Sequence, residues 1–443
     1  MNKPKVALVA LASRFESGSQ RNEEILKGAI QYLEKSGLEV KAYPETVWDP
    51  ADAFAAVDYF STQQPDLLVL LHITWVLDSL QYIFINNLKC PVILWGIPYP
   101  ETFSIGCVQH FGSILWEHGF NYKYVYGLPE NVDLIKEITR YATTAKLYKG
   151  LSSLRIALIG PRQTWRVAGS QDMTGEEWEF SKKFGVTIIH LEMDEVLERA
   201  KKQEKSVAEK TLLKFKKEQR MGKAIAGEEN LLYAAKVYLA TKEIFEHYTL
   251  DAAAAECYPK FCGLINLPSS WLADEGIILD TEGDIGHAVL MTLLNQLKPG
   301  PTALAEIGSI KGKIIYLAHE GSSAHSITEN ISKVQISPSG DLGTFVGTPL
   351  KAMPEVTMVN LCGRENTYRM LVAKVSTEEV THQEWVDGGS KFFAKVNLGA
   401  NALDKFNQML AEGVDHHFLL KEGDLVGELT DLCDLLKIRR IEI

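Results

Sequence analysis

Two glutamates and a late pair of histidines are the residues of this sequence whose types could carry out chemistry together. Glu282 lies just before an apolar stretch with helical spacing, and Glu306 follows a Gly-Pro-Thr turn. His416 and His417 come more than a hundred residues later. Carboxylates and imidazoles bind hard divalent cations, and paired carboxylates can move protons on a sugar. These residues therefore predict a metal-dependent enzyme.

The two glutamates also have a plainer interpretation. Residues 280–287 have the character of a helix N-terminus, because an aspartate before an apolar helix caps its first turn. Glu282 and Asp284 could therefore be capping residues without a further role. Glu306 follows one helix and one turn later, which could return the chain to the same place. In the mainly apolar stretch 304–307, a buried carboxylate would need a partner, and a cation is one such partner.

The histidines are weighed in the same way. His319 ends an apolar strand, where ligands often lie, although a lone histidine there is also common in a core or on a surface. His416 and His417 open the apolar run 418–420. Since adjacent strand residues point to opposite faces, we expect at most one of the pair to reach a common site. His287 and His325 are weaker candidates.

Alternating strands and helices are expected to position these residues. In the first third, strands are predicted at 6–11, 67–71 and 92–94, and helices at 22–35, 51–61 and 76–87. The alternation restarts near residue 151, with strands at 155–160 and 185–191. Such alternation favours parallel sheets with helices on both faces.

The last third has a different pattern. Strand-like runs at 313–317, 356–361, 368–375 and 393–398 follow one another, and we expect helices at 401–410 and 424–436 to close this region. The predicted fold class is therefore α/β, with two Rossmann-like parallel-sheet domains and a β-rich, barrel-like C-terminal domain. The domains are predicted at 1–150, 151–298, which carries Glu282, and 299–443, which carries Glu306, His319 and His417.

Composition excludes several kinds of partner. The chain has 443 residues, 46% of them hydrophobic and 23% charged, and a net charge of −11. Nucleic acids and anionic membranes attract clustered Lys and Arg, so we expect neither as a partner. No run approaches the roughly 18 apolar residues of a membrane span, and the N-terminus does not have the pattern of a signal peptide. A cytoplasmic protein that acts on a small molecule is the prediction.

The six cysteines do not form a convincing zinc motif. Cys257 and Cys262 are close in sequence, but their spacing is not CxxC and no matching second pair exists. Free thiols in a reducing compartment are therefore expected.

Four short motifs occur in an order that resembles the L-fucose and L-arabinose isomerase superfamily. They are Glu282-Gly283-Asp284, then Pro301-Thr302 leading to Glu306, then His319, then Gly413-x-x-His416-His417. The resemblance extends over the rest of the chain as two α/β domains followed by a β-rich domain. It implies an aldose–ketose isomerase that acts on an open-chain sugar through a cis-enediol.

The resemblance also implies roles for individual residues. Glu282 and Glu306 match the two metal-binding carboxylates that serve as acid and base. His417 matches the family's late histidine ligand, and His319 matches a histidine ligand of the arabinose branch. His416 is expected to contact the substrate. The implied cofactor is Mn²⁺ or another divalent cation, and the implied assembly is a homo-oligomer, a trimer or hexamer with sites near subunit interfaces.

The substrate is less well defined. Arg14 and Trp75 follow predicted strands, where open α/β sheets place their ligands, and are predicted to contact the sugar. Arg162 and Arg166 are further cations that could bind an anionic group. The sugar could resemble L-fucose or L-arabinose, or be an acidic or sulfonated deoxy-sugar such as sulfoquinovose. The alternative is a non-catalytic sugar-binding or regulatory protein on the same scaffold.

Overall fold

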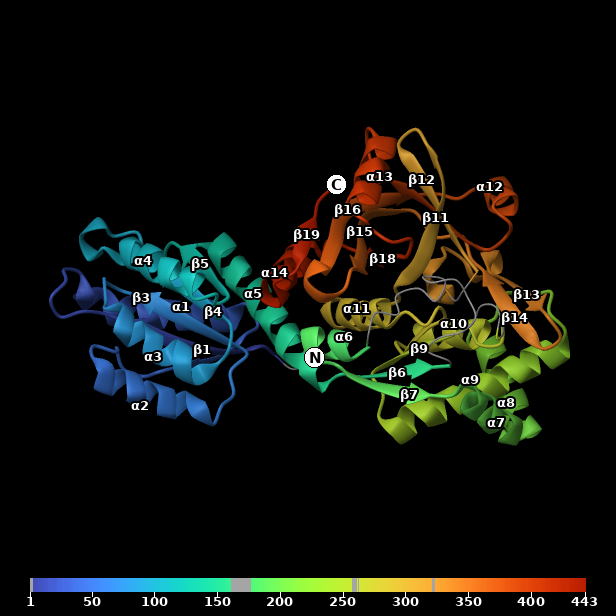
Figure 1. Cartoon of the computed structure of the whole chain (residues 1–443), viewed down its shortest axis with the longest axis horizontal. Coiled ribbons are helices and arrows are strands. Elements are labelled where there is room, and N and C mark those ends of the chain that lie inside the picture. Colours follow the sequence, from blue (N-terminus) through green and yellow to red (C-terminus); the bar gives the residue numbers. More distant parts are fainter. Residues whose placement is uncertain (1–2, 161–176, 257–260, 262, 321–322) are drawn as a thin grey trace. The chain divides into compact units, whose positions relative to one another are not determined.

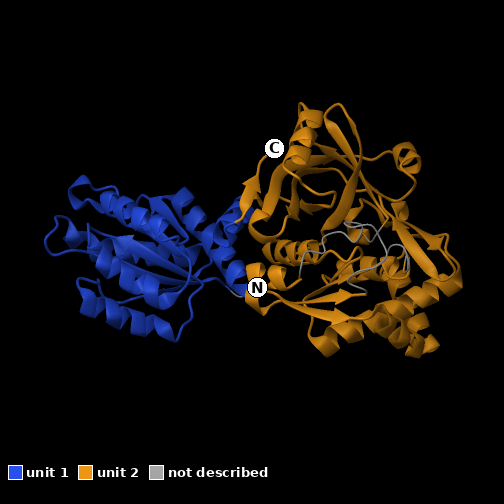
Figure 2. Cartoon of the chain, in the orientation of Figure 1, with its two compact units in different colours: residues 1–150, 427–437 blue, residues 151–426, 438–443 orange. Residues whose placement is uncertain are grey.

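The computed structural model describes residues 3–160, 177–256, 261, 263–320 and 323–443, in two compact units (Figure 2). Unit 1 comprises Met1–Gly150 and Gly427–Lys437, and unit 2 comprises Leu151–Val426 and Ile438–Ile443. The predicted region 151–298 lies in unit 2, and so does the predicted region 299–443 except for Gly427–Lys437. Arg162, Arg166, Cys257 and Cys262 lie outside the described residues.

Unit 1 is built on a parallel five-stranded sheet in the order β2-β1-β3-β4-β5 (Figure 1). Its strands are β1 (Lys5–Leu11), β2 (Glu39–Ala42), β3 (Leu67–His72), β4 (Val92–Gly96) and β5 (Tyr122–Tyr126). Its helices are α1 (Asn22–Lys35), α2 (Pro50–Ser61), α3 (Asp78–Leu88), α4 (Ser104–Glu117), α5 (Val132–Gly150) and α14 (Val426–Leu436). The strands and helices predicted for the first third are confirmed, with ends that differ by a few residues.

Helices cover both faces of this sheet. Along β1, Val6 and Leu8 pack with α1 and α5, whereas Ala7 and Val9 pack with α2, α3 and α4. Because helices cover both faces, β1 and β3 are apolar except for Lys5 at the start of β1 and His72 at the end of β3, as is typical of buried parallel strands. The continuous apolar runs in the sequence have this physical origin.

Helix α14 belongs to unit 1 although it comes from the end of the chain. Leu435 joins the core beside α1 and α5. The Asp431 side chain, 2% exposed, accepts hydrogen bonds from Lys123 Nζ at 2.6 Å and Arg140 Nε at 2.9 Å. The helix predicted at 424–436 is confirmed as α14, but the prediction that it closes the C-terminal region is wrong, because it lies in unit 1. The buried carboxylate instead binds two cations of unit 1, a long-range contact that the local pattern does not reveal.

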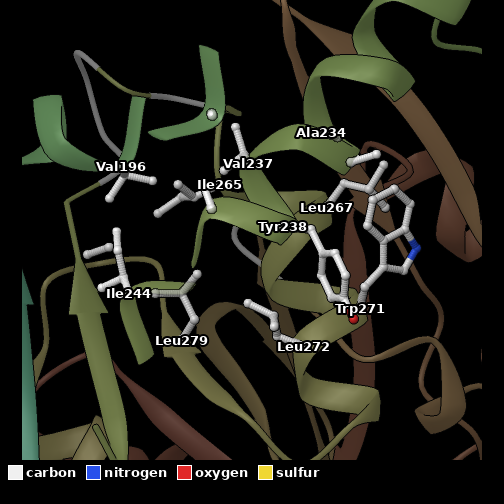
Figure 3. Close-up of a cluster of buried hydrophobic side chains, with 14 of the residues drawn as sticks. Val196, Ala234, Val237, Tyr238, Ile244, Ile265, Leu267, Trp271, Leu272 and Leu279 are labelled. Atoms are coloured by element: carbon white, nitrogen blue, oxygen red, sulfur yellow. The ribbon is translucent and has the colours of Figure 1, made fainter. Parts of the chain in front are cut away.

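Unit 2 contains a parallel four-stranded sheet in the order β10-β9-β6-β7. Its strands are β6 (Arg155–Ile159), β7 (Thr187–Leu191), β9 (Ala252–Ala255) and β10 (Ile278–Asp280). The helices around it are α6 (Glu177–Phe184), α7 (Met193–Lys202), α8 (Lys205–Lys217), α9 (Glu228–Tyr248), α10 (Asn266–Asp274) and α11 (Ile285–Leu297). On one face, Trp271 of α10 packs edge-to-face with Tyr238 of α9, near Leu279 of β10 (Figure 3).

The β-rich part of unit 2 is a seven-stranded sheet in the order β15-β18-β11-β12-β17-β16-β19. Its strands are β11 (Ala303–Lys311), β12 (Ile314–His319), β15 (Met353–Cys362), β16 (Arg369–Glu378), β17 (Phe392–Asn397), β18 (Phe418–Glu422) and β19 (Arg439–Ile441). Because β15 also pairs with β16, six of these strands form a closed cycle of pairings. The predicted mixed α/β fold with a β-rich region is confirmed, and its barrel-like form stays a prediction.

The remaining elements of unit 2 are small. A three-stranded sheet, β14-β13-β8, is made of β8 (Lys223–Ala224), β13 (Gln335–Ser339) and β14 (Gly343–Gly347). Helices α12 (His382–Asp387) and α13 (Ala402–Ala411) accompany the larger sheet. Among the described residues, no helix combines the length and apolar character needed to cross a membrane.

We predict that Asp431→Asn destabilises unit 1. Replacing the carboxylate weakens two charge-assisted hydrogen bonds at a buried position, so the free energy of unfolding should fall by about 2 kcal/mol. Urea unfolding followed by tryptophan fluorescence measures this loss. Glu137→Gln is the matched control, because Glu137 lies 3.4 Å from the same Lys123 but its side chain is 40% exposed. Equal stabilities of the two variants would contradict the importance of the buried carboxylate.

Candidate functional site

Strand pairing brings Glu306 and His417 together. Ala305 of β11 is paired with Phe418 of β18, so Glu306 and His417, the next residues, lie beside each other. Glu306 Oε1 is 3.9 Å from His417 Nε2. On the other side of β11, Glu306 is paired with Ala318, the neighbour of His319 in β12. Three neighbouring strands of the seven-stranded sheet, β18, β11 and β12, therefore bring three of the predicted residues together.

Glu282 reaches the same place from the parallel sheet. It follows β10, at the carboxyl end of the sheet, where α/β folds bind their ligands. Its Oε1 lies 3.4 Å from His319 Nε2, and its side chain is 16% exposed. Glu256, which is buried just after β9, forms an isolated bridge with Glu282. The site thus lies where the four-stranded and the seven-stranded sheets of unit 2 meet.

His417 is shared by the groups that could hold a metal ion. Glu282, His319 and His417 form one group, and Glu306, His416 and His417 form another, with ligand atoms within 4.8 Å of one another in each. The four predicted ligands are therefore spread over two groups with one common imidazole. Carboxylate and imidazole donors of this kind suit a divalent cation such as Mn²⁺. The residues present fit the implied cofactor.

Asp284 and Asp280 form a hydrogen-bonded turn beneath the ligands. Asp284 caps α11 by accepting the backbone N–H of His287 at 2.9 Å. Asp280 Oδ2 accepts the backbone N–H groups of Glu282 and Asp284 at 3.0 and 2.8 Å. The interpretation of residues 280–287 as a capped helix start is confirmed for Asp284. It does not account for Glu282, whose carboxylate faces His319 instead.

Burial and neighbouring charges shift the pKa values of this turn in opposite directions. Burial, with the charge of Asp284 beside it, raises the pKa of Asp280 to about 7. Burial also acts to raise the pKa of Asp284, but His287 and His417 outweigh it and hold that pKa well below its usual range. Burial alone would lower the pKa of His287, yet the Asp284 carboxylate raises it. An anionic Asp284 between two imidazoles is the favoured arrangement.

Two expectations about individual residues are wrong. The Glu306 side chain is 45% exposed, so its carboxylate does not need a cation to compensate for burial. His416 and His417 precede β18 in a bend, so the alternation of strand side chains does not apply to them. Their ring centroids are 4.4 Å apart, and both can face Glu306.

The predicted sugar contacts Arg14 and Trp75 lie in unit 1. Both follow strands of its parallel sheet, as expected. The Arg14 guanidinium lies over the Trp48 ring, 5.5 Å from its centroid, and Trp75 stacks on His110 at the same centroid distance. Their contact with a sugar stays a prediction, as does the role of His416.

Sequence reasoning gave little weight to several residues around His417. His287 Nδ1 lies 2.6 Å from Asp284 Oδ2. Asp415 Oδ1 accepts the backbone N–H of His417 at 3.1 Å, and Asn360 donates to the backbone carbonyl of His417 at 2.6 Å. The i, i+3 spacing of Asp284 and His287 in the sequence could have identified this pair. No local sequence pattern could have identified Asn360, because it comes from a distant strand.

Comparison with known proteins identifies three informative relatives, while no protein-family model matches the chain. A sulfoquinovose isomerase of Priestia aryabhattai is 23% identical over 436 residues, covering 92% of this chain and 94% of that protein. One from Alkalicoccus urumqiensis is 22% identical and covers 90% of both chains. One from Clostridium sp. (strain MSTE9) is 24% identical, covering 84% and 85%.

These relatives confirm that the chain is an enzyme of the aldose–ketose isomerase type, an intramolecular oxidoreductase. The likeness to the L-fucose and L-arabinose isomerase superfamily stays a resemblance. Among solved structures, a transporter solute-binding protein of Burkholderia multivorans is 13% identical and covers 68% of this chain and 95% of that one. Its TM-score of 0.19 is too low for any argument.

A buried lysine holds the turn that leads to Glu306. Lys421 of β18 is 1% exposed, and its Nζ donates to the carbonyl oxygens of Gly300 and Pro301, just before β11. Burial, aided by the nearby Lys298 charge, lowers the pKa of Lys421 to about 8. The charge on Lys421 therefore destabilises the folded state at neutral pH.

We predict that the stability of the protein relative to a Lys421→Met variant rises with pH. The folded-state pKa is below the ordinary value of 10.5, so the folded protein releases its proton first and gains stability between about pH 8 and 10.5. From pH 7.5 to 9.5 the difference in unfolding free energy should move by about 2 kcal/mol in favour of the parent. Urea unfolding of both proteins at the two pH values measures it. A difference that does not change with pH would show that Lys421 titrates normally.

Proposed function

We propose that this chain is a metal-dependent isomerase that converts an open-chain anionic sugar, of the sulfoquinovose type, from aldose to ketose. The observation that carries the proposal is that two carboxylates, Glu282 and Glu306, each lie close to His417. A pair of carboxylates suits the two proton transfers of an enediol mechanism. The relatives named sulfoquinovose isomerase support the anionic sugar.

Glu282, Glu306, His319 and His417 would hold the cation, for which we propose Mn²⁺. When bound there, a divalent cation supplies Lewis-acid polarisation of the sugar's carbonyl and the adjacent hydroxyl. Glu306 is the more accessible carboxylate, with 45% of its side chain exposed against 16% for Glu282. It is therefore the better placed to meet an incoming sugar.

The two carboxylates divide the proton transfers. One removes the proton from C2 of the aldose while the carbonyl oxygen O1 gains a proton from the other, which gives a cis-enediol. Return of the proton to C1 and loss of the proton from O2 gives the ketose. No proton is gained or lost overall. Each half of the reaction needs one carboxylate that accepts a proton and a second that donates one, so both are required.

A sulfonated substrate also requires a cationic contact. Arg14, Arg162 and Arg166 are the candidates from the sequence, and we propose that at least one of them binds the sulfonate. We further propose that the enzyme works as a homo-oligomer. A panel of neutral and sulfonated aldoses, with ketose formation as the readout, tests the substrate. Faster turnover of neutral L-sugars than of sulfoquinovose would exclude the sulfonated substrate.

Glu306→Gln should lower kcat by about 10²- to 10⁴-fold, because the amide cannot accept the transferred proton. The thermal unfolding midpoint should change little, since the side chain is half-exposed. Glu320→Gln is the control, because that nearby glutamate pairs with Lys391 instead of facing His417. Turnover by Glu306→Gln within a few-fold of the parent would eliminate Glu306 as acid or base.

Metal removal provides an independent test. Dialysis against EDTA should abolish ketose formation, and added Mn²⁺ should restore it, because the polarisation of the carbonyl depends on the cation. Isothermal titration of the dialysed protein with Mn²⁺ should give one site per chain. Full activity after exhaustive chelation would exclude the metal-dependent mechanism.

A non-catalytic sugar-binding protein is the rival function. The exposed Glu306 beside His417 favours the enzyme, because sugar binding alone does not require a second carboxylate near the same imidazole. Calorimetry that shows tight sugar binding, with no exchange of the C2 proton into solvent by NMR, would favour the rival.

A further inference from the structure

We propose that Asp284 is a positioning residue that fixes the ring orientation and tautomer of His417, so that Nε2 is presented to the metal site. The proposal deepens the proposed function and rests on it for the role of His417 as a ligand. It assigns Asp284 more than the capping of α11.

The geometry of the ring contact defines the tautomer. Asp284 Oδ2 lies 2.9 Å from His417 Nδ1, and both side chains are completely buried. An ionised carboxylate can only accept a hydrogen bond, so the hydrogen of a neutral His417 must be on Nδ1. The Nε2 lone pair is then directed to the side where Glu306 lies at 3.9 Å. A histidine ligand is commonly oriented in this way by a carboxylate on its other nitrogen.

Contacts to the carboxylate and to the backbone N–H hold Asp284 in place. Oδ1 accepts the backbone N–H of His287, and Oδ2 also lies 2.6 Å from His287 Nδ1. The backbone N–H of Asp284 donates to Asp280 Oδ2 at 2.8 Å. Rotation of the Asp284 side chain would break two of these contacts inside a buried region. Its contact with His417 is therefore pre-formed.

The backbone of His417 is fixed separately. Asp415 Oδ1 accepts its N–H, and Asn360 donates to its carbonyl oxygen. These contacts fix the backbone of His417. Asp284 contacts the ring itself, through Nδ1. The two sets of contacts thus have different tasks.

Capping alone does not explain this arrangement. The N-cap interaction of Asp284 uses Oδ1, whereas Oδ2 contacts the two imidazoles. Serine and asparagine are also good N-cap residues. Substitution by either can therefore separate the cap from the ring contact.

Two variants test the proposal. Asp284→Ser keeps the cap but is too short to reach the ring. Asp284→Asn keeps the cap and the shape, and its amide can donate to Nδ1 and so move the hydrogen to Nε2. Asp49→Ser is the matched control, because Asp49 caps α2 by accepting from the backbone N–H groups of Ala51 and Asp52. It makes the same substitution at a helix start in unit 1.

Two measurements on the metal-free proteins decide the outcome. Calorimetric titration with Mn²⁺ should show affinity reduced by about 10- to 100-fold in both Asp284 variants and unchanged in Asp49→Ser. NMR of ¹⁵N-histidine-labelled protein, with the His417 signal assigned by a His417→Asn variant, should show Nδ1–H in the parent and Nε2–H in Asp284→Asn.

The two readouts separate this proposal from the proposed function. Mn²⁺ affinity of Asp284→Ser within twofold of the parent, with an unchanged thermal midpoint, would overturn the positioning role. An Nε2–H tautomer in the parent would overturn it as well. If the parent does not bind Mn²⁺, the metal-dependent function fails, and the NMR result still decides whether Asp284 orients the ring.

Discussion

The pairing of β11 with β18 is the constraint on which the site depends. It places Glu306 next to His417, which come from segments far apart in the sequence. Side chains alternate along a strand with a period of two, so a slip of one residue would turn Glu306 to the other face of the sheet. Lys421 opposes such a slip, because it ties β18 to the turn before β11. The buried lysine thus stabilises the register of the two strands, although burial lowers its pKa.

Helix α11 connects this register to the parallel sheet. It packs against β6, β9 and β10 on one side and against β15 and β18 on the other. Its first ten residues are buried, which is typical of a helix that is apolar all round. Because α11 is enclosed between two sheets, Asp284 at its start has a fixed position between β10 and His417. The packing of the fold and the position of Asp284 beside His417 therefore depend on the same helix.

The sequence predicted much of this architecture and part of the site. The helix expected at 22–35 matches α1 (Asn22–Lys35). Its apolar residues lie along one face, its first turn carries acidic residues, and its last turn carries a basic residue. The neighbours predicted for helix α14 were wrong, since Asp431 contacts Lys123 and Arg140 across sequence separations of 308 and 291 residues. The residue types around Glu282 and Glu306 predicted that the two glutamates belong to one site. Strand pairing and the turns between the strands bring them together. The support of His417 by Asn360 and Asp415 depends on tertiary contacts that no local pattern contains.

The electrostatics of the site explain why so much structure surrounds it. Asp280, Glu282 and Asp284 lie within five residues of one another, and the repulsion between buried carboxylates opposes folding. Two of these carboxylates are offset internally: Asp280 accepts two backbone N–H groups, and Asp284 lies between two imidazoles. Glu282 and Glu306 are the carboxylates left to face His319 and His417. Folding thus partners Asp280 and Asp284 inside the unit and leaves Glu282 and Glu306 facing the imidazoles of the proposed metal site. Pre-arranged charge of this kind, held by packing elsewhere in the unit, is what allows a proposed metal site to form without large rearrangement on binding.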